Sequence, residues 1–290
     1  ERSQSQFDIT IIGKEPYPNY NRIMLSNILQ KKMTVEDTIM NPYDWYQENN
    51  IELINNDPVE KVDKENKIVT TSKGIEVEYD ICIFATGSKA FVLPIPGSNL
   101  PSVIGWRTID DTNKMIEIAQ TKKRAVVIGG GLLGLECARG LLDQGMEVTV
   151  LHLADWLMEM QLDRKAGEML KADLEKQGMK IELQANSKEI IGDKDVEAIK
   201  LADGRVIETD LVVMAVGIRP YTVVAKDSGL DVNRGIVVND YMQTSDSHIY
   251  AVGECAEHDG KVYGLVAPLY EQGKVLADYL TGKETKGYKG

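Results

Sequence analysis

Cysteine is scarce in this sequence, and its cysteines form no pair that could cycle between thiols and a disulfide. Cys82, Cys137 and Cys255 are far apart, and none belongs to a C-x-x-C motif. This pattern excludes a disulfide framework, a cysteine-based metal site and the thiol redox pair of a disulfide reductase. It is typical of a reducing compartment, so we expect a cytoplasmic protein.

Neither long apolar runs nor an excess of positive charge is present. The formal net charge is −12, which argues against nucleic acid or an anionic membrane as a partner because both repel an acidic surface. Apolar runs such as residues 81–85 and 211–216 are far shorter than the roughly 20 residues that span a bilayer. What is present is a globular mixture, 43% hydrophobic and 27% charged, in 290 residues. That length is enough for about two domains.

Two stretches of the sequence repeat one pattern. Residues 51–87 and 181–217 have the same length, and Asp80 and Asp210 occupy matching positions in them. Each stretch consists of short runs typical of β-strands, separated by turn residues, and ends in a continuous apolar run followed by glycine. Such a run is expected of a buried parallel strand that meets a ligand at its end. We therefore predict two related domains, each with a small antiparallel meander.

The second repeat is preceded by a complete βαβ unit. Residues 124–128 read as an apolar strand, a helical pattern follows, and residues 147–151 read as the next strand. The turn between strand and helix has the pattern G-x-G-x-x-G. Gly129 permits the tight turn, Gly131 lets a pyrophosphate approach the backbone, and Gly134 lets helix and strand pack closely. Because the helix N-terminus also offers N–H groups to phosphates, this unit predicts dinucleotide binding.

The first repeat should have the same unit in front of it. Residues 7–12 read as its second strand, with Glu15 just beyond. At the spacing of the complete unit, the matching glycine turn falls before residue 1. The sequence also opens at Glu1 without a methionine, so we expect a piece of a longer natural protein. A domain without the first strand, which is normally a central one, should have a gap in its sheet.

These features predict an α/β fold of two Rossmann-like dinucleotide-binding domains. Each should be a three-layer arrangement with a parallel sheet and a small antiparallel meander, and the second domain should be inserted in the first. The expected first domain comprises residues 1–105 and returns over residues 222–290. The expected second domain comprises residues 106–221.

This plan resembles the pyridine nucleotide–disulfide oxidoreductase superfamily over the whole chain. The segments A-T-G-S (85–88) and A-V-G-I-R-P (215–220) carry the resemblance, which implies FAD in the first domain and NAD(P)H in the second. A narrower resemblance, to the large subunit of assimilatory NAD(P)H nitrite reductase, rests on R-T-I-D-D (107–111), G-G-G-L-L-G-L-E (129–136), Q-L-D (161–163), G-E-C-A (253–256) and G-L-V-A-P (264–268). In that family, iron–sulfur and sirohaem domains follow and reduce nitrite to ammonia.

The resemblance implies a set of flavin contacts. They are Glu15, Arg22, Val59, Thr86, Gly87, Gly253, Glu254 and Pro268. Glu254 replaces the aspartate that usually holds the flavin ribityl chain, and it keeps the carboxylate on a longer arm. Pro268 should start a helix whose N-terminus points at the flavin pyrimidine. Plainer interpretations remain open, such as a solvated carboxylate for Glu15, a surface ion pair for Arg22 and ordinary helix initiation for Pro268.

The resemblance also implies nicotinamide-dinucleotide contacts. They are Gly129, Gly131, Gly134, Glu136, His152 and Gly217. His152 stands where NAD-specific domains usually carry an acid for the ribose hydroxyls. No Lys or Arg occurs from residue 153 to 160, while Asp155 and Glu159 would repel a 2′-phosphate, so we expect NADH in preference to NADPH. Glu136 is either a residue near the nicotinamide or an acid favoured by the helix dipole. No catalytic acid or base is assigned, because the cofactors carry hydride transfer.

The leading hypothesis is therefore an NADH-oxidising flavin module that passes electrons to the downstream centres of a nitrite reductase. One alternative is a stand-alone ferredoxin or rubredoxin reductase or an NADH oxidase. Ferredoxin-reductase-like members usually carry a lysine where this chain has Asn27, which argues mildly against that alternative. Another alternative is that the piece, without the first glycine turn, binds NAD and has no activity.

Overall fold

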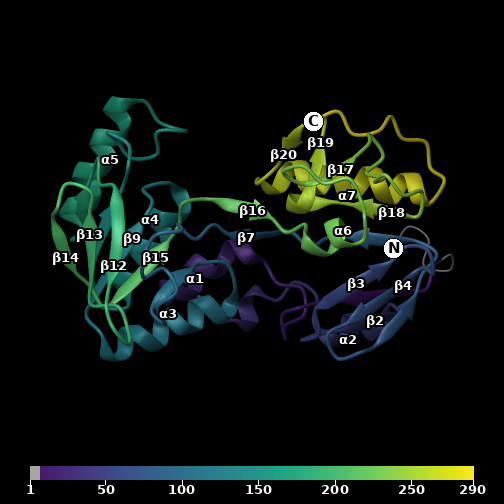
Figure 1. Ribbon diagram of the computed structural model, residues 1–290, viewed down its shortest axis with the longest axis horizontal. Coiled ribbons are helices and arrows are strands. Elements are labelled where there is room, and N and C mark those ends of the chain that lie inside the picture. Colours follow the sequence, from purple (N-terminus) through teal and green to yellow (C-terminus); the bar gives the residue numbers. More distant parts are fainter. Residues whose placement is uncertain (1–6) are drawn as a thin grey trace. The chain divides into compact units, whose positions relative to one another are not determined.

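The computed structural model describes residues 7–290, which divide into two compact units (Figure 1). Unit 1 comprises residues 7–20, 40–89 and 218–290, and unit 2 comprises residues 21–39 and 90–217. The second unit is thus inserted in the first. Its limits differ from the expected domain boundaries, because the chain passes between the units at 89/90 and 217/218. The segment 21–39 also belongs to unit 2, although the sequence placed it in the first domain.

A five-stranded parallel sheet forms the centre of unit 2, in the order β11-β10-β9-β15-β8. Its strands are β8 (Val103–Gly105), β9 (Arg124–Ile128), β10 (Glu147–Leu151), β11 (Lys180–Glu182) and β15 (Leu211–Met214). The predicted bounds of β9 and β10 are confirmed. Apolar residues occupy most positions of both strands, and their burial agrees with a parallel sheet that is covered on both faces.

Helices and a meander cover the two faces of this sheet. Its helices are α1 (Leu25–Leu29), α3 (Ile109–Thr121), α4 (Leu132–Asp143) and α5 (Arg164–Lys176), with 3₁₀ turns η1 (Arg22–Met24) and η2 (Glu36–Thr38). The helix α4 packs on β9 and β10, and α1 packs on α3 and α4. The antiparallel meander is β12 (Ser187–Ile191), β13 (Ala198–Leu201) and β14 (Val206–Glu208). One core joins Val126, Val212 and Met214 of the sheet to Ile190 and Ile199 of the meander.

Unit 1 contains the corresponding meander but a divided parallel sheet. The meander is β3 (Val59–Asp63), β4 (Ile68–Thr71) and β5 (Glu76–Glu78). The parallel strands form two pairs, β1 (Ile9–Ile12) with β2 (Ile51–Ile54), and β6 (Cys82–Phe84) with β18 (Ile249–Ala251). Within residues 7–290, no strand lies between β1 and β6. The predicted α/β architecture with a parallel sheet and antiparallel meanders is confirmed. Unit 1 differs from unit 2 in that these parallel strands form two separate pairs.

The return segment completes the core of unit 1. The remaining elements of unit 1 are α2 (Tyr43–Glu48), before that segment, and α6 (Val223–Asp227), α7 (Val266–Leu280), η3 (Gly253–Cys255), β17 (Ile236–Val238), β19 (Ala256–His258) and β20 (Lys261–Val262), within it. β7 (Ser88–Ala90) pairs with β16 (Ile218–Pro220) where the chain passes between the units. The core joins Phe84 of β6 to Ile249 and Ala251 of β18 and to Leu276 of α7. No helix among residues 7–290 is long and apolar enough to cross a membrane.

Candidate functional site

The glycine turn between β9 and α4 contains two glycines that the fold requires and one that it does not. Gly129 has φ +116°, and a Cβ there would lie 2.3 Å from the carbonyl oxygen of Ala215. A Cβ on Gly134 would lie 1.9 Å from the carbonyl oxygen of Gly129, so both positions require glycine for the fold itself. A Cβ on Gly131 would meet nothing within 4 Å. The packing of the protein itself therefore does not require glycine at this position.

The first turn of α4 faces open space. Gly131 is its N-cap and has no side chain to cap the helix, so the N–H groups of the first turn are left for another acceptor. Leu132 and Leu133 next to it are 61% and 41% exposed. An uncapped helix N-terminus beside an open glycine fits a pyrophosphate, because its N–H groups and dipole favour negative charge.

Two other predicted contacts lie at the same edge of the sheet. Gly217 follows β15 and has φ +108°. His152 follows β10, and its side chain is buried, with 6% of the residue exposed. The N–H of Gly130 donates to His152 Nδ1 over 3.0 Å, and Nε2 lies 2.9 Å from Glu159 Oε2. Both ring nitrogens are thus already engaged within unit 2.

Glu136 points from α4 towards α1 rather than towards solvent. It is half-buried, and burial raises the pKa of its carboxyl, while a hydrogen bond from Ser26 lowers it. Ser26 lies in α1 and is itself 7% exposed. A carboxyl with a raised pKa at a partly buried position is a common feature of functional sites, although packing between helices alone also produces it.

Four of the flavin candidates in unit 1 come together where β6 and β18 end. The N–H of Val252 donates to Phe84 O over 2.9 Å, which sets Thr86 and Gly87 beside the segment of Gly253 and Glu254. Glu254 Oε2 accepts a hydrogen bond from Ser88 Oγ at 2.8 Å. The segments 84–88 and 252–254 therefore form one continuous surface at the carboxyl ends of two parallel strands, the usual place for a ligand in such sheets.

Backbone conformation at this surface depends on glycine and on one buried amide. Gly87 has φ +61° and Gly253 has φ +85°. Gln272 of α7 is fully buried, and its Oε1 accepts a hydrogen bond from the N–H of Gly253 at 2.9 Å. Thr86 Oγ1 donates to Tyr221 O over 2.7 Å. The sequence did not single out Ser88 or Gln272. Ser88 belongs to the A-T-G-S segment, but its partner Glu254 lies 166 residues later in the chain. Gln272 belongs to none of the motifs and reaches Gly253 through the fold of α7 onto η3.

The helix α7 begins two residues earlier than expected. It starts at Val266, so Pro268 is its third residue rather than its first. Proline is tolerated there because the first-turn N–H groups have no partner within the helix. Leu265 is the N-cap, offers no side-chain cap and is 75% exposed. The N-terminus of α7 is therefore open, as the predicted flavin contact requires.

The remaining flavin candidates are spread over both units. Glu15 lies beyond β1 and accepts a hydrogen bond from the Tyr20 hydroxyl at 2.6 Å. Val59 is the first residue of β3. Arg22 belongs to unit 2, where its guanidinium donates to the carbonyl oxygen of Arg107. The structure thus brings the residues of β6, β18 and η3 together, while Glu15, Val59 and Arg22 lie elsewhere.

The three thiols are held in their protonated form. Burial raises the pKa of the Cys82 thiol to about 12 and also raises the pKa values of Cys137 and Cys255. Since the thiolate is the reactive species, these cysteines are poor nucleophiles. Within residues 7–290, no group of three or more His, Cys, Asp or Glu side chains could hold a metal ion.

Comparison with known proteins gives consistent results. The model of a family described as pyridine nucleotide-disulphide oxidoreductase matches residues 1–273. The chain is 57% identical over 288 residues to a nitrite reductase (NAD(P)H) of Bacillus subtilis (strain 168), covering 99% of this chain and 36% of that protein. It is 45% identical over 288 residues to the assimilatory nitrate reductase electron transfer subunit of the same organism, covering 99% and 37%. The chain thus spans little more than a third of these relatives.

A solved structure agrees with the fold. The crystal structure of NADH:rubredoxin oxidoreductase from Clostridium acetobutylicum matches with a TM-score of 0.84 and 32% sequence identity. The match covers 100% of this chain and 72% of that one. The fold of both units, with their meanders and parallel strands, is therefore a known one.

Proposed function

We propose a function from the premise that the chain belongs to the pyridine nucleotide-disulphide oxidoreductase family. The chain is, in this proposal, the NADH-oxidising flavin reductase module of an NAD(P)H nitrite reductase. The observation that carries the nucleotide part is the open glycine turn of unit 2, where Gly131 and the uncapped start of α4 face outwards. The identity of 57% with a nitrite reductase carries the rest.

The residues of unit 2 would bind and orient the dinucleotide. The first-turn N–H groups of α4 would hold its pyrophosphate, and the backbone at Gly131 lets that group come close. Gly217 would let the coenzyme pass the end of β15, because a side chain with φ +108° would be strained there. Glu136 would lie nearer the nicotinamide, on the side of α4 that faces α1.

The residues of unit 1 would hold the ribityl and pyrimidine end of FAD. Glu254, supported by Ser88, would accept hydrogen bonds from the ribityl hydroxyls. The open N-terminus of α7 would favour negative charge on the flavin ring. Thr86 and Gly87 would border the ring, Val59 and Glu15 would contact the adenosine, and Arg22 would face the flavin or its diphosphate. When bound, FAD supplies the acceptor for the hydride of the nicotinamide.

Electrons would pass from the flavin to iron–sulfur and sirohaem centres in other domains of a nitrite reductase. Those centres would reduce nitrite to ammonia. This part of the proposal is supported by the relatives' names and by the share of their length that the chain covers. The raised thiol pKa values agree with it, because a module without a thiol pair must pass electrons on through other groups. We place the module in the cytoplasm, where such thiols stay reduced.

A stand-alone rubredoxin or ferredoxin reductase is the second candidate. The likeness to an NADH:rubredoxin oxidoreductase at 32% identity favours it. A third candidate, in which the 290 residues bind NAD alone, is favoured by the glycine turns. Among residues 7–290, a glycine-rich turn between a strand and a helix of a parallel sheet occurs only at Gly129–Gly134.

Binding to the 290-residue chain tests the nucleotide site. We expect calorimetry to show NADH binding, and we expect Gly131→Ala to weaken it by about tenfold or more, because the new Cβ points towards the pyrophosphate. The melting temperature should stay within about 2 °C, since that Cβ meets no protein atom. Gly273→Ala in α7 is the matched control, because its Cβ also meets nothing within 4 Å. An NADH affinity that Gly131→Ala leaves unchanged would place the coenzyme elsewhere.

Two further measurements separate the candidates. FAD binding to the same chain, read as flavin absorbance of about one equivalent, would refute the NAD-only module. In the full-length protein, nitrite-dependent oxidation of NADH would support the nitrite reductase. Oxidation that depends on rubredoxin or ferredoxin and ignores nitrite would replace it with the second candidate.

A further inference from the structure

The loop that follows β10 folds back onto the glycine turn. The N–H of Gly130 donates to the His152 ring, and the carbonyl oxygen of Gly130 accepts a hydrogen bond from the N–H of Met158 at 3.1 Å. Met158 adopts a left-handed backbone with φ 58°, which reverses the direction of the loop. Leu157 before it is fully buried. One residue of the turn, Gly130, therefore anchors both the beginning and the far side of this loop.

The His152 ring is fixed in orientation and in tautomer. The backbone N–H of His152 donates to Glu182 O, and the carbonyl oxygen of His152 accepts from the N–H of Ala185, both at 2.9 Å. Because Nδ1 accepts the hydrogen bond of Gly130, the neutral ring carries its proton on Nε2. That Nε2 lies 2.9 Å from a carboxylate oxygen of Glu159 and donates to it. The imidazole thus acts as a rigid arm between the glycine turn and Glu159.

Glu159 is the accessible end of this arm. Its side chain is 35% exposed, while that of His152 is 8% exposed. Among residues 7–290, Oε2 is held by His152 and Oε1 has no hydrogen-bond partner. A carboxylate oriented by one oxygen and open at the other suits vicinal hydroxyl groups, which need acceptors. It stands beside the turn whose open side fits the pyrophosphate.

The charges around Glu159 disfavour a phosphate at the same place. No Lys or Arg occurs from residue 153 to 163. The next cation along the chain, Arg164, is paired with Asp155 over 2.5 Å and lies over the Trp156 ring, with 4.8 Å between its guanidinium carbon and the ring centroid. A 2′-phosphate would therefore meet the Glu159 carboxylate without a compensating positive charge.

We propose that Glu159, held in place by His152, accepts hydrogen bonds from the adenosine ribose of the coenzyme and selects NADH against NADPH. His152 is a positioning residue and does not itself contact the coenzyme. The inference rests on the proposed function, because it requires the dinucleotide to bind at the Gly129–Gly134 turn. It moves the carboxylate that recognises the ribose from the end of β10 to a residue seven positions later.

Binding of NADH and of NADPH to the 290-residue chain, measured by calorimetry, tests the role of Glu159. We expect Glu159→Gln to lower the ratio of the NADPH Kd to the NADH Kd by about tenfold, since the charged acceptor and the repulsion are both lost. Glu117→Gln, at an exposed position of α3 in the same unit, is the control, because it removes the same charge from a helix and not from this loop, and it should leave the ratio within about twofold. A ratio that Glu159→Gln leaves unchanged, with NADH still bound, would overturn the inference and leave the proposed function intact.

Variants of His152 distinguish positioning from mere support of the fold. His152→Leu should lower the same ratio, whereas His152→Gln should preserve most of it, because an amide can accept from Gly130 and donate to Glu159. In the Glu159→Gln background, His152→Leu should change the ratio no further, since residues of one network are non-additive. A purely structural histidine would weaken both coenzymes equally at an unchanged ratio, and that result would overturn the positioning role. A wild-type chain that binds neither coenzyme would overturn the proposed function together with the inference.

Discussion

β15 and β6 occupy matching places in the two sequence repeats, yet their burial differs. Val213 in β15 is 0% exposed, while Ile83 at the matching position in β6 is 46% exposed. β15 is hydrogen-bonded to β9 on one side and to β8 on the other. Within residues 7–290, β6 is paired with β18 alone. Similar apolar sequences thus reach different degrees of burial because their neighbours differ.

The strands β10 and β1 repeat the same contrast. Val150 pairs with Ile181, and Ile9 pairs with Ile51, where Ile181 and Ile51 are the matching first residues of the two repeats. Val150 is 0% exposed and Ile9 is 45% exposed. In unit 2, β9 lies between β10 and β15, and α4 packs on β9 and β10. The βα element in the middle of the sheet of unit 2 therefore buries the strands on both sides of it.

Disturbing the packing of α4 on β9 should lower the protection of the neighbouring strands of unit 2 towards that of β1 and β6 in unit 1. This is the largest effect that we expect. Gly134→Ala places a Cβ 1.9 Å from the carbonyl oxygen of Gly129, which should destabilise unit 2 by about 3 kcal/mol. Amide hydrogen exchange followed by mass spectrometry should show faster exchange in the peptides of β10 and β15. The peptides of β1 and β6 serve as the internal reference.

Gly131→Ala is the control for this experiment, because it lies in the same turn and its Cβ meets nothing within 4 Å. It should leave the exchange of β10 and β15 unchanged. Wild-type protection of both strands in Gly134→Ala would contradict the central role of the βα element.

A direct substitution in the paired strands should give the next largest effect. Val213→Ala removes two buried methyl groups and should cost about 2 kcal/mol of unfolding free energy in unit 2. Ile83→Ala removes more atoms but should cost less than about 1 kcal/mol in unit 1, because half of that side chain is already in water. Hydrogen exchange of the peptides of each unit measures both. A larger cost for Ile83→Ala than for Val213→Ala would refute the explanation from burial.

Local pattern was sufficient for much of the fold. Residues 124–128 and 147–151 form β9 and β10 with the predicted bounds, because short, largely apolar runs before a G-x-G-x-x-G turn and after the helix that follows it have few alternatives. The two meanders and the insertion of one unit in the other also follow from the repeat. The sequence predicts that α7 starts at Pro268, two residues after its observed start at Val266, because proline is also tolerated later in the first turn of a helix.

Long-range packing was beyond the reach of the pattern. The segment 21–39 joins unit 2 because Leu29 packs against α4, where a Cβ on Gly140 would lie 2.5 Å from the Leu29 side chain. The local sequences around Leu29 and Gly140 do not predict that contact. The site shows the same limit, because the carboxylate expected at position 152 is supplied in our proposal by Glu159, through a fold of the loop that a linear motif does not contain.

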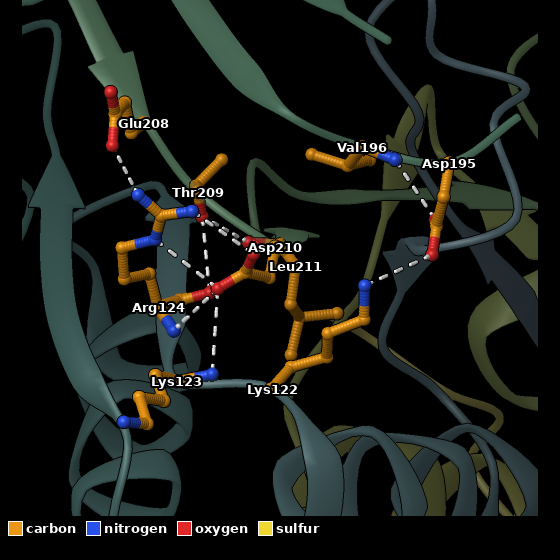
Figure 2. A network of polar contacts seen from close by, with 9 residues as sticks. All are labelled: Lys122, Lys123, Arg124, Asp195, Val196, Glu208, Thr209, Asp210 and Leu211. Carbon is orange, nitrogen blue, oxygen red and sulfur yellow. Dashed lines mark hydrogen bonds and ion pairs between the residues drawn. The ribbon is translucent and has the colours of Figure 1, made fainter. Parts of the chain in front are cut away.

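The matching aspartates differ in the same way as the strands that follow them. Figure 2 shows Asp210 joined to Arg124, whose Nη2 donates over 3.1 Å and whose backbone N–H donates over 3.0 Å. Arg124 also pairs with Glu208. The hydrogen bond from the Arg124 side chain, more than any other contact, lowers the pKa of the Asp210 carboxyl. Arg124 is the first residue of β9, so this pairing too depends on the central strand, whereas Asp80 in unit 1 is exposed.

The smallest effect that we expect comes from this aspartate, and it depends on pH. A carboxyl whose pKa is lower in the folded state stabilises the fold above its unfolded pKa of about 4, and that stabilisation is lost as the pH falls through the folded value. Asp210→Asn should therefore cost unit 2 about 1 kcal/mol at pH 7 and much less at pH 2. Urea unfolding followed by peptide-resolved hydrogen exchange at both pH values measures this. Asp80→Asn, the matched variant of unit 1, should change its stability by less than about 0.5 kcal/mol at pH 7. Equal costs for the two variants at pH 7 would mean that the Arg124 pairing adds nothing, and the contrast between the units would then lie in apolar burial alone.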